Sequence, residues 1–167
     1  MNFQLTSNSG RGNFTITDQE GKALSTIAYE SWFSSTASAT VDGREVVIKS
    51  RNIWSSNFDV FVDGVDRGDI TFNWKGHIII KLTGETGATQ TVRLRMKGFW
   101  NYHFVLENEQ ETILMELRPT FKWQKMNYNY DVHFAQDTVS SFDRALLLII
   151  CGYGANLYMT MMAGAAA

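Results

Sequence analysis

Hydrophobic residues recur at every second position over most of the chain, from Asn2 to about Phe134. A period of two is typical of β-strands that bury one face. The clearest runs are Phe58, Val60 and Val62; Ile70, Phe72 and Trp74; Ile78, Ile80 and Leu82; Val92, Leu94 and Met96; Trp100, Tyr102, Phe104 and Leu106; Ile113, Met115 and Leu117; and Tyr128, Tyr130, Val132 and Phe134. Between the runs lie turn signals such as "VDGRE" and "VDGVDRGD", in which Asp-Gly favours tight turns with positive φ. The pattern predicts roughly a dozen short antiparallel strands, as in a sandwich or a closed barrel.

The period changes at "SSFDRALLL", where a helix is expected to begin. Ser140 or Ser141 can cap the helix, and Asp143 suits the positive end of its dipole. From Ala145 to Ala167 no charged side chain occurs, and leucine and isoleucine cover every side of the helical wheel. A helix over about 141–162 that is apolar all round is surrounded either by lipid or by protein.

Length alone permits a membrane anchor, because about 20 helical residues reach roughly 30 Å. Gly152 and Gly154 in its interior, the polar Asn156 and Thr160, and the lack of a basic cluster after it argue against a span. Geometry favours enclosure, since a barrel of about twelve strands is wider than its own side chains fill, and a helix about 10 Å across fits inside.

We therefore expect a mainly β fold, a closed antiparallel barrel of about twelve strands that encloses the C-terminal helix, with no integral membrane span. The small residues Gly152, Gly154 and Ala155 would let inward-facing aromatic rings such as Trp74, Trp100 or Phe104 approach the helix backbone.

Composition narrows the class of protein. A chain of 167 residues without internal repeats suits one domain over 1–167. Its 15 basic and 17 acidic residues give a net charge of -2, which argues against nucleic acid as a partner. The single cysteine, Cys151, cannot form an internal disulfide, and the start of the chain has no secretory signal, so we expect a cytoplasmic location.

The order of elements resembles the tubby C-terminal-like superfamily, which includes tubby domains, phospholipid scramblases and LURP-one-related proteins. The most similar residues are "YDVHFAQDTVSSFDRALLLIICGYGANLY", Tyr130 to Tyr158, which resemble the family's last strand, an acidic residue (here Asp137) and a leucine-rich helix. The stretch "ITDQEGKALSTI", Ile16 to Ile27, is similar to an early strand, turn and strand of the family. The resemblance implies a helix running through the barrel. Tubby domains bind phosphoinositides through basic residues on neighbouring strands, so it also implies an anionic lipid as ligand, although no matching motif assigns a residue.

The strongest candidate binding residues lie in "VRLRMK". Alternation places Arg93, Arg95 and Lys97 together on the face opposite Val92 and Leu94. Three cations on one outer face can hold a phosphorylated headgroup by charge-assisted hydrogen bonds, although such a row is also ordinary on a solvated surface. Lys122 and Lys125 in "FKWQK" would extend this patch if their strand lay alongside.

Other chemistries have weaker support. The four aspartates of "DVFVDGVDRGD" lack the spacing of an EF-hand and fit ordinary turns, and His77, His103 and His133 lack the spacing of a zinc motif, so no metal or other cofactor is expected. No nucleophile elbow or P-loop occurs. The sequence predicts a non-enzymatic binding or scaffold domain whose partner is an anionic membrane lipid or a protein, cytoplasmic or peripheral at a membrane. The alternatives are a tail-anchored β domain and an enzyme of unknown chemistry.

Overall fold

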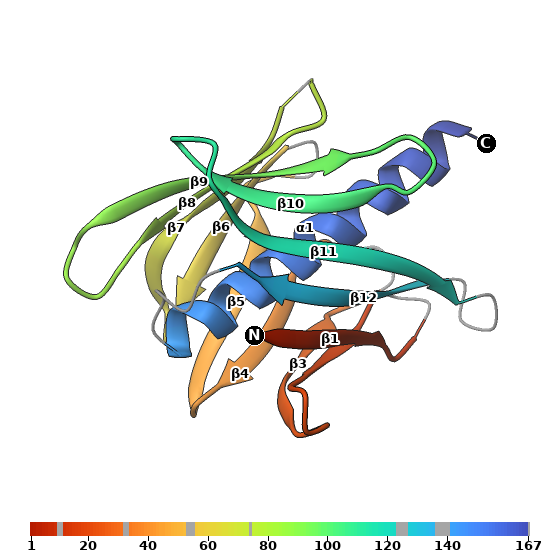
Figure 1. The fold of residues 1–167 in the computed structure, drawn as a ribbon. Helices are drawn as coiled ribbons and strands as arrows, with labels where there is room; N and C mark the ends of the chain where they lie inside the picture. The colour runs from red at the N-terminus through yellow and green to blue at the C-terminus, as the bar shows by residue number, and fades with distance from the viewer. Residues whose placement is uncertain are drawn as a thin grey trace.

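Twelve strands and one helix make up the chain in the computed structural model, which describes residues 1–9, 12–31, 34–52, 56–73, 75–122, 127–135 and 141–166 (Figure 1). The strands are β1 (Asn2–Ser7), β2 (Phe14–Thr17), β3 (Ala23–Tyr29), β4 (Ala37–Val41), β5 (Arg44–Ser50), β6 (Asn57–Val62), β7 (Val65–Phe72), β8 (Ile78–Thr83), β9 (Thr89–Lys97), β10 (His103–Asn108), β11 (Ile113–Lys122) and β12 (Asn127–Phe134). The helix α1 follows them and spans Ser141–Ala166, so it runs on past its expected end.

The strands form a closed antiparallel barrel. Each strand pairs with the next one in sequence, and β1 pairs with β12 to close the sheet. At this closure Phe3 faces Val132 and Leu5 faces Tyr130, and all four side chains are buried. The predicted fold class is confirmed: the period of two in the sequence arises because every strand turns one face to the barrel interior.

Tight turns at two hairpins have the backbone that their sequences require. In both Asp-Gly pairs each residue has positive φ, 49° and 77° at Asp42 and Gly43, and 51° and 75° at Asp63 and Gly64. Two consecutive residues of this kind match the twist of antiparallel strands. The Asp63 carboxylate also accepts a hydrogen bond from the Glu45 backbone N–H at 2.9 Å, which ties the two hairpins together.

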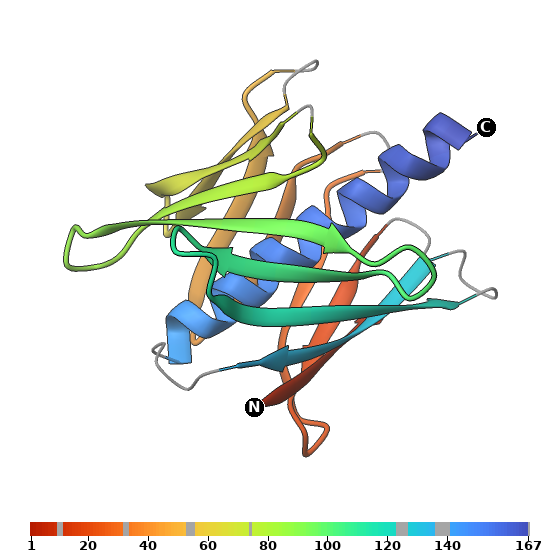
Figure 2. The ribbon, with the colours of Figure 1, turned by 45° about the horizontal axis from the view of Figure 1, so that its top comes forward.

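The helix α1 occupies the interior of the barrel. It runs along the barrel and leaves it at one end (Figures 1 and 2). Every residue from 145 to 156 is buried. Over Asp143–Ala163 the helix has a mean hydropathy of 1.6, enough by composition for a membrane span, yet 67% of the stretch lies buried within the protein. A helix enclosed on all sides must be apolar all round, which explains why it has no polar face.

Polar contacts fix how far α1 enters the barrel. The Tyr153 hydroxyl donates to the Ser35 carbonyl at 2.7 Å, and the Asn156 side-chain amide donates to the Gly12 carbonyl at 3.1 Å. Both acceptors lie in connections at the end where the helix leaves. We call this the exit end, and the opposite end, where Ser141 begins the helix, the start end.

Glycine lets the sheet approach the helix, as expected, but the aromatic neighbour differs from the expected ones. A Cβ on Gly152 would lie 2.5 Å from side-chain atoms of Leu5 and Phe14. Phe104 does face inward and contacts Tyr158, with ring centroids 5.6 Å apart. Trp100 was wrongly expected to face inward: it lies beyond β9 and is exposed. Trp74 lies outside the described residues.

The two helix glycines make a matched test of this packing. We expect Gly152→Ala to destabilise the protein by about 1–3 kcal/mol, because the new methyl group overlaps the buried side chains of Leu5 and Phe14. Gly154→Ala adds a methyl 3.4 Å from Ile78, which is an ordinary contact, and gains about 1 kcal/mol of helix propensity. Urea denaturation of both variants checks this, and equal stabilities would contradict the close approach at Gly152.

Candidate functional site

The outer face of the β9–β10 hairpin carries a cluster of four charged side chains, Arg93, Arg95, Lys97 and Glu107, which we call the cation cluster. Strand β9 buries Val92 and Leu94 in the core, so alternation turns its three cations outward. Glu107 reaches the same face because β10 pairs with β9 and sets Glu107 opposite Arg93. The register therefore places one carboxylate among three cations.

All three cations bind Glu107. One Glu107 oxygen, Oε2, accepts from Nη2 of Arg93 at 3.1 Å and from Nε of Arg95 at 2.8 Å. The other, Oε1, accepts from Nη2 of Arg95 at 2.9 Å and lies 2.7 Å from Nζ of Lys97. These are charge-assisted bonds, and the pair to Arg95 is bidentate.

Glu107 is 1% exposed although it lies on the outside of the barrel. Val105, which points the same way, is also fully buried. Lys97 pairs with His103, so its side chain must pass over Val105 to reach Glu107. The aliphatic stems of the cluster thus cover apolar surface while their charged heads meet at one carboxylate.

The cations of the cluster help to lower the pKa values of Glu107 and His77. The hydrogen bond from Arg95 is the main cause that lowers the pKa of Glu107 to about 2, with further bonds from Lys97 and Arg93. Burial lowers the pKa of His77, and the nearby charges of Arg93 and Arg95 lower it further. An imidazole beside these cations resists protonation because the local potential is positive.

The cluster has more positive charge and more donors than its carboxylate satisfies. Three cations surround one buried carboxylate, and the other acid in contact, Glu111, binds only Arg93, at 3.2 Å, with a side chain that is 72% exposed. The Nε of Arg93 is buried without a hydrogen-bond partner in the described part of the chain. A buried donor of this kind is costly, and solvent does not reach it. The side chains of the three cations are partly exposed, so their surplus charge suits a further anion.

Two further lysines, Lys122 and Lys125, were candidates for extending the cation cluster. Strand β10 lies between β9 and β11, so Lys122, the last residue of β11, is not on a neighbour of β9. Lys125 lies outside the described residues. For Lys122, the condition under which it would extend the patch, adjacency of its strand to β9, is not met.

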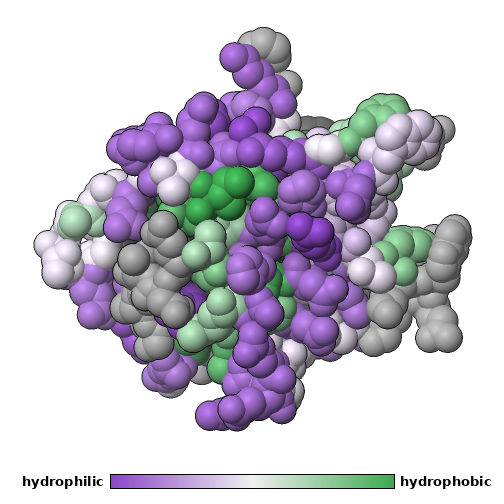
Figure 3. Space-filling view, in the orientation of Figure 1, coloured by the Kyte–Doolittle hydropathy of each residue, from purple (hydrophilic) through white to green (hydrophobic). Residues whose placement is uncertain are grey.

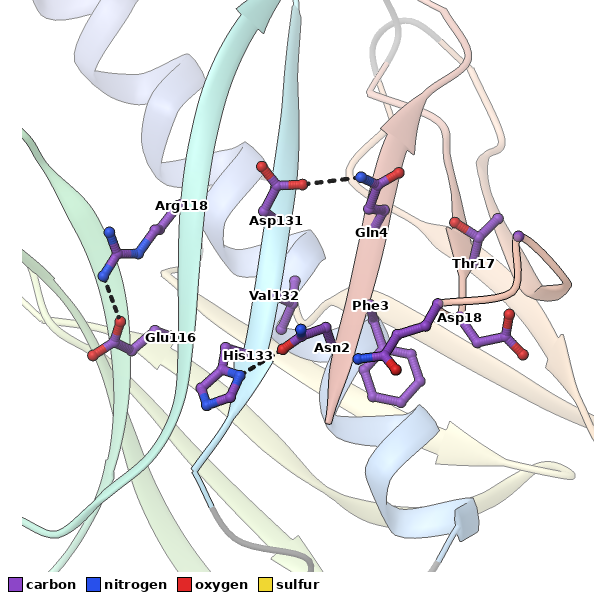
Figure 4. Close-up of a pocket in the computed structure, with 12 residues that line it drawn as sticks. Asn2, Phe3, Gln4, Thr17, Asp18, Glu116, Arg118, Asp131, Val132 and His133 are labelled. Atoms are coloured by element: carbon purple, nitrogen blue, oxygen red, sulfur yellow. Dashed lines mark hydrogen bonds and ion pairs between the residues drawn. The ribbon is translucent and has the colours of Figure 1, made fainter.

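A second feature is a hollow of about 580 Å³ on the outside of the barrel where β1 meets β12, which we call the seam pocket (Figure 4). Its polar side chains bind one another: Gln4 donates to Asp131 at 3.2 Å, Arg118 to Glu116 at 3.1 Å, and His133 hydrogen-bonds to Asn2. Asp18, Glu116 and Asp131 outnumber Arg118, so the lining is acidic. The seam pocket therefore does not suit an anion.

The aspartates of the β6–β7 region have structural partners. Asp59 and Asp69 bind Arg51 at 2.7 and 3.6 Å, and Asp66 accepts a hydrogen bond from the Gly68 N–H at 2.9 Å. Within the described residues no three His, Cys, Asp or Glu side chains come together as metal ligands. These aspartates have the turn chemistry that their sequence indicates.

Sequence reasoning missed Glu107. Alternation around Leu106 does place it on the outer face, but its burial depends on the β9–β10 register, which one strand alone does not reveal. The available signal was the run of three cations on the preceding strand of the same hairpin. A carboxylate on the same face of the partner strand can form cross-strand ion pairs with such cations.

Figure 3 shows the face formed by β10, β11 and β12, where hydrophilic side chains surround a smaller hydrophobic area.

No family model matches the chain, and no curated protein matches it. Among solved structures, the X-ray structure of an Arabidopsis thaliana protein, AT5G01750, is similar, with a TM-score of 0.55 and 18% identity over 90% of this chain and 88% of that one. At this identity the likeness shows a shared fold and assigns no ligand.

Glu107→Gln should reveal the electrostatic contribution of the cluster. The pKa of Glu107 is lower in the folded than in the unfolded protein, so its stabilisation is complete above pH about 4.5 and is lost as the pH falls towards 2. We expect the variant to be about 3 kcal/mol less stable than the wild type at pH 7, and this difference to shrink between pH 5 and 3. Urea denaturation across this pH range measures it.

Glu111→Gln is the control, because this exposed residue binds only one cluster cation and should change stability by less than about 1 kcal/mol. A pH-independent difference between the wild type and Glu107→Gln would show that Glu107 does not titrate as an ion-paired carboxylate.

Proposed function

We propose that this chain is a non-enzymatic binding domain of the tubby-like superfamily that recognises anionic lipid headgroups, such as phosphoinositides, through its cation cluster. It would act in the cytoplasm, peripherally at a membrane, with α1 kept inside the barrel. The observation that carries the proposal is the gathering of Arg93, Arg95 and Lys97 around one carboxylate, which leaves surplus positive charge on an outer face.

The cluster is organised before any ligand arrives. Glu107 holds Arg95 by two hydrogen bonds, so the guanidinium does not have to be ordered on binding. A phosphate that approaches from solvent would meet the donors that Glu107 does not use. Guanidinium groups suit phosphate because their N–H groups form a planar fork.

Two further observations support this reading. The order of strands and the enclosed helix agree with the layout of the tubby-like superfamily, and a similar fold occurs in the Arabidopsis protein. Six polar side chains of the seam pocket are engaged with one another in pairs, and its acidic lining does not suit an anionic headgroup, which favours the cation cluster as the lipid site. With a net charge of -2, the protein as a whole does not favour nucleic acid, and the attraction must come from the local cluster.

The test is flotation with vesicles of phosphatidylcholine alone and with added phosphatidylserine or phosphatidylinositol bisphosphate. Replacing Arg93, Arg95, Lys97 and Glu107 together by glutamine removes the charges without leaving a buried carboxylate unpaired. Each cation near an anionic surface contributes about 1 kcal/mol, and the removed carboxylate offsets one of the three cations, so the net loss of two positive charges should weaken binding about 30-fold. Glu107→Gln alone keeps the three cations and should still bind anionic vesicles, unlike the quadruple variant.

The control replaces three cations on other strands and turns, Lys22, Lys49 and Arg67, by glutamine, and should float like the wild type. A second readout is the pKa of His77, followed by NMR, which should rise when inositol trisphosphate occupies the cluster. Failure of the wild-type protein to bind any anionic vesicle, or equal binding by the quadruple variant, would refute the proposed function.

A further inference from the structure

Two large aromatic side chains project into solvent at the tip of the hairpin that carries the cation cluster. Phe99 is 86% and Trp100 92% exposed, and their rings contact each other edge to face, 5.2 Å apart. Gly98 precedes them with a φ of 84°, and a Cβ there would lie 2.7 Å from the Asn101 carbonyl. This tight turn holds the rings beyond the end of β9, away from the core.

The aromatic tip lies at the same end of the barrel as the last turns of α1 (Figures 1 and 2). There Met161 and Met162 are 56% and 50% exposed. In the described part of the chain, four of the six exposed large hydrophobic residues are thus at the exit end, and the other two, Met1 and Val65, are at the start end. Exposed apolar groups that gather on one side mark an interaction surface.

The two ends of the barrel also differ in the charged residues of their turns. The five turns at the start end carry seven carboxylates, those of Asp18, Glu20, Asp42, Asp63, Glu85, Glu109 and Glu111, and one lysine, Lys22. Three of these carboxylates form ion pairs with arginines of the strands: Arg44 binds Asp63 and Glu85, and Arg93 binds Glu111. In the described part of the exit-end connections the charged residues are Arg51, Lys75 and Glu30, and Arg51 forms ion pairs with Asp59 and Asp69 of β6 and β7. The start end keeps an excess of carboxylates, so an anionic surface is repelled less by the exit end than by the start end.

We infer that the exit end docks on an anionic bilayer and that Phe99 and Trp100 insert into its interface. The inference rests on the proposed function and deepens it by naming the orientation and the inserting residues. Aromatic rings, tryptophan above all, favour the headgroup level of a bilayer. The cluster lies directly behind the tip: Lys97 precedes Gly98, and Arg95 and Arg93 follow at steps of about 6.6 Å along the strand. Insertion of the tip thus brings Lys97 to the headgroups, a layer of roughly 5–8 Å per leaflet, with Arg95 and then Arg93 farther from the bilayer centre, where they meet headgroups that project from the surface.

A single fluorescent probe can report the depth of the tip. The one cysteine of the chain, Cys151, is fully buried, so a thiol reagent should label only a cysteine introduced at the surface. Asn101→Cys places the probe beside the two rings without removing either. Glu109→Cys, in an exposed turn at the start end, is the matched control. On vesicles of phosphatidylcholine and phosphatidylserine, we expect lipid-borne quenchers to quench an NBD group at position 101 and not one at position 109.

The second measurement removes the rings. Phe99→Ser with Trp100→Ser should weaken partitioning onto the same vesicles at least tenfold, whereas Val65→Ser, which removes an exposed hydrophobic side chain at the start end, should leave it unchanged. The two substituted residues are exposed, so the fold should stay intact, as thermal denaturation will check.

The outcomes separate the two proposals. In one outcome the wild type binds and loss of the cluster charges abolishes binding, but the probe at position 101 stays in water and the serine variant binds fully. This outcome refutes the insertion and leaves the headgroup site in place. If the wild type binds no anionic vesicle, both fall. If light scattering shows a dimer that the serine variant loses, the rings cover a second copy of the chain and the inference is overturned.

Discussion

The barrel depends on the contact between its inward faces and α1. A closed sheet of twelve strands has an interior too wide for its own side chains, and close packing requires that the space be filled. The helix supplies this filling from one continuous segment. Strands far apart in sequence pack against it, as Leu5 and Phe14 do at Gly152 and Ile78 and Leu94 do at Gly154, so their stability is linked through the helix. The hydrogen bonds of Tyr153 and Asn156 to the exit-end connections then set the depth at which this filling sits.

The same constraint explains what could be predicted from the sequence. Strands that surround a dry interior must alternate, and a helix inside them must lose its polar face, so both patterns were visible without coordinates. Alternation predicts the wrong orientation for Trp100, because Trp100 matches the period of Phe104 and Leu106 but lies before the first residue of β10, His103. Gly98, with its positive φ, ends β9 just before this point, and it was the local signal that the rings beyond it belong to a turn.

The candidate site was only half accessible to sequence reasoning. Outward positions for Arg93, Arg95 and Lys97 follow from the period of one strand. The burial of Glu107 follows from a pairing between two strands and from side chains that fold over Val105, and neither is encoded in one run of residues. Lys122 shows the same limit, since its strand is separated from β9 by β10. Sequence gives the face on which a residue lies, and register decides its neighbours.

Glu107 gives the cation cluster two properties that oppose each other. Its carboxylate holds the cations together, and without it three like charges would repel on one face. Yet each bond that it accepts occupies a donor that an external anion would use. A second anion can share these cations only because one carboxylate leaves positive charge over on side chains that are partly exposed. An anion bound there adds to the role of Glu107 instead of replacing it, so binding and folding stability should rise together, as they do for any ligand that binds only the native state.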